Sequence, residues 1–465
     1  MSLDRHQLST EDRDHGQRLL LRFFSINGIT VACLMDSVLI LYAIRNGMND
    51  AVVAVLASFV QLTMPFMPIG YGLVRVLGLA RTWAACWAIR SVFALTVVLA
   101  PRLHIQFGQT AATGVILLGM FGFALFKSIG MVTVTPLIGE ITTQNERGRF
   151  MAEIFLHDNV SYLLATIAAI GVISWMPSIS TYQMVIVAGC CAGILGSRVV
   201  RRVPESAAPK ASAAAPVWDS IRVLRSNRNL RRVIAAWAGG FAGVALVLPV
   251  STITVKNGYG ASDSTALILG LIVIVGGIGA ARLGSVVSDR SGPRPLLMLY
   301  ALVLVFSAAF WAVAPSHFSP YLTGLVFLAN GLAKGGVIIE TGHVLLRETT
   351  QEDRVNVSLV TRVATGAVAG LSGSVLAGSL LAALSSQGLV GLPLYRWYFR
   401  AVIPLLMVCM VPACRLPSHS GWPVMRLLRT IASPRCVRAL VHRARPRHVS
   451  NVAQDIEASR GPEGL

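Results

Sequence analysis

The sequence predicts an all-α polytopic membrane protein, with twelve transmembrane helices in two pseudo-symmetric six-helix halves. Three observations support this fold class. Hydrophobic residues make up 54% of the 465 residues and charged residues only 13%, and the mean hydropathy is +0.66, which is typical of a polytopic membrane protein. The chain contains a series of apolar stretches long enough to cross a bilayer, each about 20 residues. A sequence motif in the first half of the chain also occurs a second time in the second half.

The repeat joins a lysine inside an apolar stretch to a polar tripeptide at a fixed distance. Lys127 is followed fifteen residues later by Thr142–Gln144, and Lys334 is followed fifteen residues later by Thr349–Gln351. Each copy continues with an acid and an arginine, Glu146–Arg147 and Asp353–Arg354. The equal offset indicates a duplicated half with a buried cation at matching positions. Paired helical halves with a site between them are the plan of secondary transporters.

Twelve apolar stretches of spanning length follow one another along the chain. They fall at about 21–44, 51–74, 82–100, 111–138, 152–175, 181–199, 233–255, 263–287, 295–314, 320–345, 358–385 and 397–415. Several contain Gly or Pro, which membrane helices tolerate when neighbouring helices satisfy the backbone. The stretches predict five segments: an N-tail (1–20), a first half (21–199), a linker (200–232), a second half (233–415) and a basic C-tail (416–465).

The basic residues are distributed unevenly between the predicted loops. With a cytoplasmic N-terminus, about 30 of the 40 Lys and Arg residues lie in the tails and the even-numbered loops, and about four on the other side. This asymmetry follows the positive-inside rule and places both termini in the cytoplasm. It also assigns the net charge of +19 to membrane topology and not to nucleic-acid binding. The short loops are typical of a bacterial inner (plasma) membrane, and we expect a monomer.

Cysteine usage and known catalytic motifs argue against a metal site or an enzyme. Six of the seven cysteines lie within or at the ends of the predicted spans, and no CxxC or CxxH pattern occurs. Neither HExxH nor GxSxG is present, so an intramembrane hydrolase has no sequence support. We therefore expect no cofactor, no metal and no catalytic residue.

The segment between the eighth and ninth spans carries a longer motif. It reads Gly284-Ser-Val-Val-Ser-Asp289-Arg290-Ser-Gly292-Pro-Arg294, and it resembles the Gly-x4-Asp-Arg-x-Gly-x-Arg signature of the major facilitator superfamily. The resemblance implies a position after the second span of a half, which is where this motif lies. The first-half counterpart retains Gly70, Gly72, Arg75, Gly78 and Arg81 but has no acid in the place of Asp289.

The motif predicts a cytoplasmic latch. Gly292 allows a tight turn and Gly284 a close helix contact. Asp289 is expected to accept hydrogen bonds from a neighbouring helix N-terminus and to pair with Arg290 or Arg294. The repeated acid–arginine pairs, Glu146–Arg147 and Asp353–Arg354, are predicted to gate by forming ion pairs that break as the two halves move.

The resemblance also implies which spans line a central cavity, namely the first, fourth, seventh and tenth. Three of these carry ionisable residues, Asp36, Lys127, and Lys334 with Glu340. Charges at such depth are costly and usually mark a site. Asp36 and Glu340 are candidates for proton coupling, and all four residues for substrate binding. A purely structural pairing of each lysine with an acid is the alternative, and Arg90 is expected to pair with Asp158 or Asp36.

The predicted function is a secondary active transporter that moves a small organic solute by alternating access, with an anion or zwitterion favoured and protons as the coupling ion. Its partners are then the small-molecule substrate, protons and the lipid bilayer. Two alternatives stay open. One is a proton-driven exporter of drugs or cations that uses Asp36 as the cation acceptor. The other is a lipid flippase or sensor, in which the basic linker and tail bind lipid headgroups.

Overall fold

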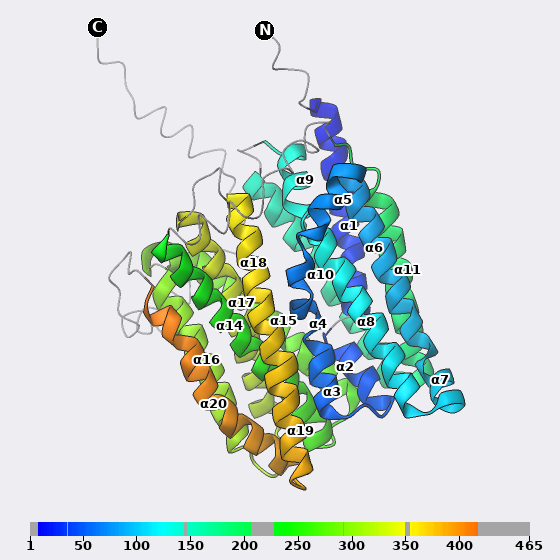
Figure 1. Cartoon of the computed structure of the whole chain (residues 1–465), viewed down its shortest axis with the longest axis vertical. Helices are drawn as coiled ribbons and strands as arrows, with labels where there is room; N and C mark the ends of the chain where they lie inside the picture. The colour runs from blue at the N-terminus through cyan, green and yellow to red at the C-terminus, as the bar shows by residue number, and fades with distance from the viewer. Residues whose placement is uncertain are drawn as a thin grey trace.

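The structure is a computed structural model that describes residues 8–34, 36–143, 147–205, 227–291, 293–348 and 354–416, without the side chains of 36, 147–149, 152, 285–291, 293, 341–348, 354–356 and 358. Within this part the regular elements are all helices. The helices run along the long axis in two neighbouring bundles, one blue to teal and one green to orange (Figure 1). The first bundle is the N-terminal half and the second is the C-terminal half.

The N-terminal half contains the first six spans in sequence order. The first span is formed by α1 (Thr10–Leu34) and α2 (Asp36–Arg45), and the second by α3 (Asp50–Ala57), α4 (Phe59–Leu62), η1 (Met64–Phe66) and α5 (Ile69–Leu77). The third contains α6 (Leu79–Thr96), η2 (Val97–Leu99) and α7 (Ala100–Phe107), and the fourth contains α8 (Gln109–Met131) and α9 (Val134–Ile141). The fifth and sixth are α10 (Arg147–Trp175) and α11 (Ile179–Val200).

The C-terminal half repeats this order. Its first span is α14 (Arg228–Ile253) extended by the π-helix η3 (Thr254–Gly258), followed by α15 (Asp263–Ser291), α16 (Pro293–Ala312) and α17 (Pro320–Glu348). The eleventh span consists of α18 (Arg354–Leu371), η4 (Ser372–Ala377) and α19 (Gly378–Ser386), and the twelfth is α20 (Leu392–Cys414).

Eleven helices of the described chain are long and apolar enough to cross a membrane. The predicted span at 51–74 is not among them, because it is divided into four short helices. Pro65 lies in η1 and Pro68 directly precedes α5. Proline has no backbone N–H and disrupts the preceding helical turn, which accounts for these breaks. The other predicted spans agree with observed helices to within about five residues, except that the first begins earlier, at Thr10, and the third continues to Phe107.

Two boundaries differ from the sequence interpretation. Residues Gly284 to Ser291 continue α15, so the first part of the motif is helical, and only residue 292 separates α15 from Pro293 at the start of α16. Proline is favoured in the first turn of a helix, where its missing donor costs nothing. Similarly, α14 begins at Arg228, so the last residues of the predicted linker belong to this helix.

The most extensive contacts between the halves are those of two span pairs. The fifth span packs on the eighth, as α10 on α15, and the eleventh packs on the second, as α18, η4 and α19 on α3, α4 and η1. Glycines allow the second approach: a Cβ added to Gly370 would lie 2.4 Å from the Leu62 Cα, and one added to Gly366 would lie 2.2 Å from the Met64 Cβ. Small residues let membrane helices approach this closely.

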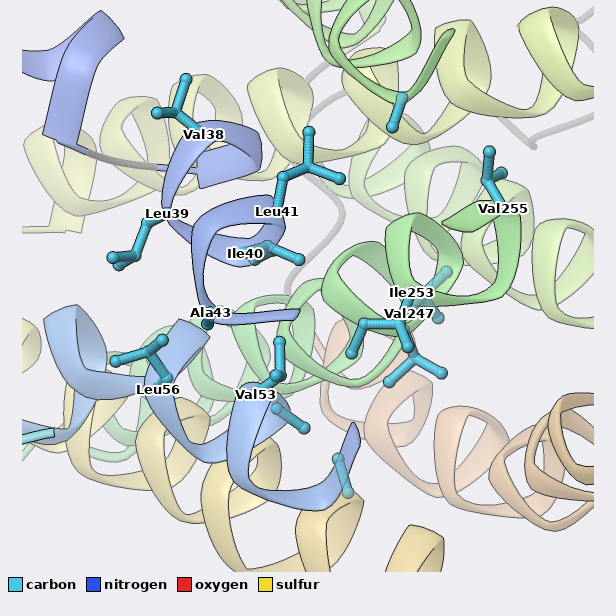
Figure 2. Close-up of a cluster of buried hydrophobic side chains, with 14 of the residues drawn as sticks. Val38, Leu39, Ile40, Leu41, Ala43, Val53, Leu56, Val247, Ile253 and Val255 are labelled. Carbon is cyan, nitrogen blue, oxygen red and sulfur yellow. The ribbon is translucent and has the colours of Figure 1, made fainter. Parts of the chain in front are cut away.

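One apolar core continues across both halves near the ends of the first and seventh spans. Side chains of α2 and α3 pack there with side chains of α14 and η3, and Figure 2 shows Leu41 and Val53 on one side facing Val247 and Ile253 on the other. All four are buried. This end of the molecule lies opposite the first turn of α1 (Figure 1) and is therefore the predicted outer end, and it is closed by apolar packing between the halves.

Candidate functional site

Lys127 lies on α8 between two residues that pack within its own half. Its neighbour Ser128 hydrogen-bonds Thr63 of the second span at 2.9 Å, and Gly130 packs on Trp87 of α6. A helix turns by about 100° per residue. Around the axis of α8, Ser128 therefore lies about 100° to one side of Lys127, and Gly130 lies about 60° to the other side. Lys127 is half-buried between them and interacts electrostatically with Asp158 of α10.

Asp158 belongs to a polar group that joins three helices of the N-terminal half. The Asn27 amide of α1 donates to Asp158 Oδ1 at 3.1 Å. The Asn27 Oδ1 accepts from Arg90 Nη2 and from Trp87 Nε1, each at 3.1 Å. Asn27 thus connects a carboxylate to a cation through both ends of one amide. Buried polar groups that are satisfied in this way fix the relative positions of their helices.

Arg90 is held inside the bundle by aromatic faces. Its side chain is 1% exposed, and its guanidinium carbon lies 4.0 Å from the Trp87 ring centroid and 5.2 Å from that of Phe123. Cation–π contacts are strongest where water is excluded. The structure therefore connects Arg90 to Asp158 through Asn27, one of the two pairings expected from the sequence.

Lys334 occupies the matching place in the C-terminal half. Gly335 packs on Gly277 and Ala280 of α15, while Val337 contacts the position of Gly240 on α14. Lys334 lies between these two directions on α17, with about the same angles as Lys127 on α8. Both α14 and α15 contact the N-terminal half. Among the described residues, the Lys334 ammonium has no hydrogen bond or ion pair.

Glu340 lies elsewhere on the same helix. It is 0% exposed, and its Oε1 would be 3.0 Å from a Cβ added to Gly284 of α15. It also interacts electrostatically with Tyr300 of α16. Glu340 is therefore enclosed within the C-terminal half, away from the side of α17 that carries Lys334.

Asp36 begins α2, and its side chain lies outside the described residues. The backbone places it nine residues after Asn27, or about 13 Å further along the first span. The adjacent Ser37 packs against Gly270 of α15. The described contacts of Lys127 involve Asp158, so the predicted proximity of Asp36 and Lys127 stays a prediction.

Two polar clusters join the halves at the predicted outer end. Asp263, 4% exposed at the start of α15, pairs with Arg45 of α2 and with Lys256 of η3 at 2.5 Å, and it accepts a hydrogen bond from the Tyr182 hydroxyl of α11 at 2.8 Å. In the second cluster, Asp50 of α3 accepts hydrogen bonds from Asn257 of η3 and Tyr395 of α20. Sequence reasoning missed both clusters, because they are formed by ordinary loop charges.

The predicted gating residues are only partly described. The side chains of Asp289, Arg290, Arg147 and Arg354 lie outside the described residues, as do Gly292, Glu146 and Asp353 entirely. Arg294 donates to the Cys414 carbonyl of α20 at 2.7 Å, a favourable contact of a cation with a helix C-terminus. Gly284 provides the close helix contact expected of it, with Ile339 and Glu340 of α17.

An acidic side chain does contact the first-half motif, but this residue lies outside the motif in the sequence. Glu205, after α11, accepts a hydrogen bond from the Ala80 backbone N–H at 2.9 Å and so caps α6. It packs against Gly78, whose φ of +91° favours glycine. In the described part of the chain, no group of three His, Cys, Asp or Glu side chains could hold a metal ion.

Comparison with known proteins identifies the family. The sequence model of the Major Facilitator Superfamily matches residues 23–339. The chain belongs to this superfamily. It is therefore a multi-pass membrane protein and a secondary transporter of a solute, and not an enzyme. The sequence matches no curated protein at a significant level.

Solved transporters of this superfamily share the fold at low sequence identity. A structure of a mutant of the nucleoside transporter NupG is similar with a TM-score of 0.69 and 11% identity, over 85% of this chain and 99% of that one. A bacterial homologue of the human lysosomal transporter Spinster, inward-facing and unoccupied, has a TM-score of 0.62 and 14% identity over 92% and 100%. A bacterial homologue of the human drug peptide transporters PepT1 and PepT2 has 0.60 and 13% over 90% and 99%.

Proposed function

We propose that this superfamily member transports a small organic anion or zwitterion, coupled to protons, by alternating access of its two halves. The observation that carries the proposal is the matched placement of Lys127 and Lys334. They stand at equivalent positions of the repeat, and each lies on its helix between two residues that pack within its own half. A solute bound between the halves would receive one cation from each.

The Lys334 ammonium favours an anion. Among the described residues it forms no ion pair, whereas Lys127 interacts electrostatically with Asp158. Uncompensated charges in a low-dielectric region are costly. A carboxylate or phosphate on the solute would relieve that cost, whereas a cationic drug would raise it, and this is the argument against the exporter alternative.

Asp158 is the carboxylate that we assign to proton coupling. It interacts electrostatically with Lys127 and Arg90, so its protonation would leave two positive charges without their anion. The group would then bind an anionic solute more strongly, and loss of the proton would favour release. A carboxylate in this position couples one proton to one negative charge of the solute. Asp36 and Glu340 remain predicted coupling residues, and Glu340 would need helix movement to exchange its proton.

Ligand-dependent melting of the purified protein tests the proposal. The panel contains organic anions, zwitterions, cations and neutral solutes, since a ligand at one hundred times its Kd stabilises a protein by about 2.7 kcal/mol. Stabilisation by anions or zwitterions, lost in Lys127→Gln and in Lys334→Gln, supports the proposal. Arg362→Gln on α18 is the matched control, because it removes a half-buried cation from a helix that the site does not use. Stabilisation by cations alone would support the exporter.

The proposal also includes the membrane in which the protein lies and the side of it on which the two termini lie. We place the protein in the inner (plasma) membrane with both termini in the cytoplasm, on the distribution of Lys and Arg. The four predicted outer cations, Arg45, Arg102, Lys256 and Arg396, lie near the ends of helices at one end of the molecule. Labelling of a single cysteine at Arg102 and another at Arg201 by an impermeant reagent in whole cells tests this orientation. Only the first is expected to react.

A further inference from the structure

A basic pocket lies where the seventh and twelfth spans reach the predicted cytoplasmic surface. It has a volume of about 530 Å³ and is lined by Arg228, Arg231, Arg232, Ala235, Pro412 and Arg415. Three of the arginines come from the first two turns of α14, and the fourth directly follows α20. No acidic side chain lines it among the described residues. Four arginines among the lining residues of one pocket predict an anionic ligand, and arginine binds phosphate oxygens through paired N–H groups.

The pocket adjoins an apolar groove along the same helix. The groove, of about 380 Å³, is lined by residues of α16 and α20 and ends at Arg415: Leu302, Val305, Met407, Met410, Val411, Cys414 and Arg415. Met407 and Val411 are exposed. Arg415 belongs to both the pocket and the groove. The basic pocket and the apolar groove therefore meet at one residue.

The combination of a basic pocket and an apolar groove favours a lipid over a soluble anion as the ligand. A free phosphate or a solute carboxylate would use the arginines but would leave the groove between α16 and α20 uncovered. An acyl chain that fills such a groove gains van der Waals contacts with its exposed methionine and valine side chains. Basic pockets between membrane helices on the cytoplasmic side are suited to anionic headgroups.

We propose that this pocket and groove bind one anionic phospholipid of the cytoplasmic leaflet. The phosphodiester contacts Arg228, Arg232 and Arg415, and one acyl chain lies along α16 and α20. The site is separate from the solute site, since neither Lys127 nor Lys334 lines it. Because α14 also contacts α2 and α3 of the other half, the lipid binds to a helix that takes part in the contact between the halves.

Native mass spectrometry of the full-length protein, titrated with phosphatidylglycerol or phosphatidylcholine, tests the headgroup. We expect one phosphatidylglycerol to be retained in preference to phosphatidylcholine. The preference should fall about fivefold for each arginine removed, as in Arg232→Gln and Arg415→Gln, since each basic residue near anionic lipid contributes about 1 kcal/mol. Arg201→Gln and Arg202→Gln, at exposed positions directly after α11, are matched controls that should leave the preference unchanged. Equal retention of both lipids would overturn the proposal.

A second variant tests the groove without altering charge. Val411→Trp fills the groove and should weaken phosphatidylglycerol retention, while Met184→Trp, at an exposed position of α11, should not. The last measurement tests whether an excess of inorganic phosphate displaces the bound lipid. If phosphate displaces the lipid from the wild-type protein, or if Val411→Trp has no effect, the site is one for a free anion and the lipid proposal is wrong.

Discussion

Arg45, the last residue of α2, forms an ion pair with Asp263, the first residue of α15, and thereby joins the two halves at the predicted outer end. Lys256 and Tyr182 bind the same carboxylate. Tyr182 also belongs to the apolar core shared by α2, α3 and α14, part of which is drawn in Figure 2. A solute leaving or entering on this side would have to pass these contacts, so they must separate in the alternating-access cycle.

Arg45→Gln should shift the protein toward an outward-open state. A hydrogen bond to a charged group contributes about 1.5–3 kcal/mol, so the open fraction should rise by about tenfold or more. The measurement is the alkylation rate of Val255→Cys, a buried position beside the cluster, by an impermeant maleimide in a cysteine-free background.

The control for this experiment is Arg102→Gln. Arg102 is also a predicted outer cation, but it is exposed on α7 and away from Asp263. It should leave the alkylation rate unchanged. If Arg45→Gln and Arg102→Gln behave alike, the ion pair does not hold the outer end closed.

Asp158→Asn should uncouple transport from protons while preserving exchange. Asparagine retains an oxygen that can accept from Asn27, so the polar group keeps its geometry, but the side chain no longer carries a proton that can be released. In proteoliposomes, uptake driven by a pH gradient should be lost, whereas counterflow of labelled solute should continue within about a factor of a few of wild type.

Asp36→Asn and Glu340→Gln are the matched comparisons, because each removes one of the carboxylates predicted from the sequence to couple protons. If Asp36→Asn alone abolishes gradient-driven uptake, coupling resides in the outer part of the first span, and the role assigned here to Asp158 is wrong.

Helix positions were predictable because burial in lipid imposes a length and an apolar composition on each span. The stretch at 181–199 became α11 (Ile179–Val200), and the motif around Asp289 placed the family correctly. The breaks in the second span were less predictable, because they depend on where Pro65 and Pro68 fall relative to neighbouring helices.

The partners of the buried charges were harder to predict, because they depend on helix rotation and on packing between distant segments. The sequence did not point to Asp158 as a neighbour of Lys127, with which it interacts electrostatically, and a pairing of Lys127 with Asp36 stays a prediction. Asn27 was missed, although a polar residue in the middle of an apolar span was a signal for it. The enclosure of Glu340 against Gly284 follows from how closely α17 approaches α15, which no single helix reveals.

Glu205→Ala should loosen the first turn of α6. The carboxylate caps the Ala80 N–H, and loss of a cap costs about 1 kcal/mol. The backbone amides of residues 79–82 should therefore exchange with deuterium about fivefold faster. Glu205→Gln, which keeps an acceptor oxygen, should exchange at an intermediate rate. Unchanged exchange in Glu205→Ala would show that the charge does not stabilise this helix end.

Gly370→Ala should destabilise the observed packing of the eleventh span on the second. The added Cβ would lie 2.4 Å from the Leu62 Cα and 2.5 Å from its nitrogen, and backbone atoms cannot move away as a flexible side chain can. Overpacking of this kind costs about 1–3 kcal/mol, so the melting temperature in detergent should fall. Gly171→Ala is the control, because Gly171 is also helical but has no atom within 4 Å of its added Cβ. Its melting temperature should stay the same or rise slightly, since alanine restricts the unfolded chain. Equal losses in both variants would mean that α18 and α4 do not approach as closely as the structure indicates.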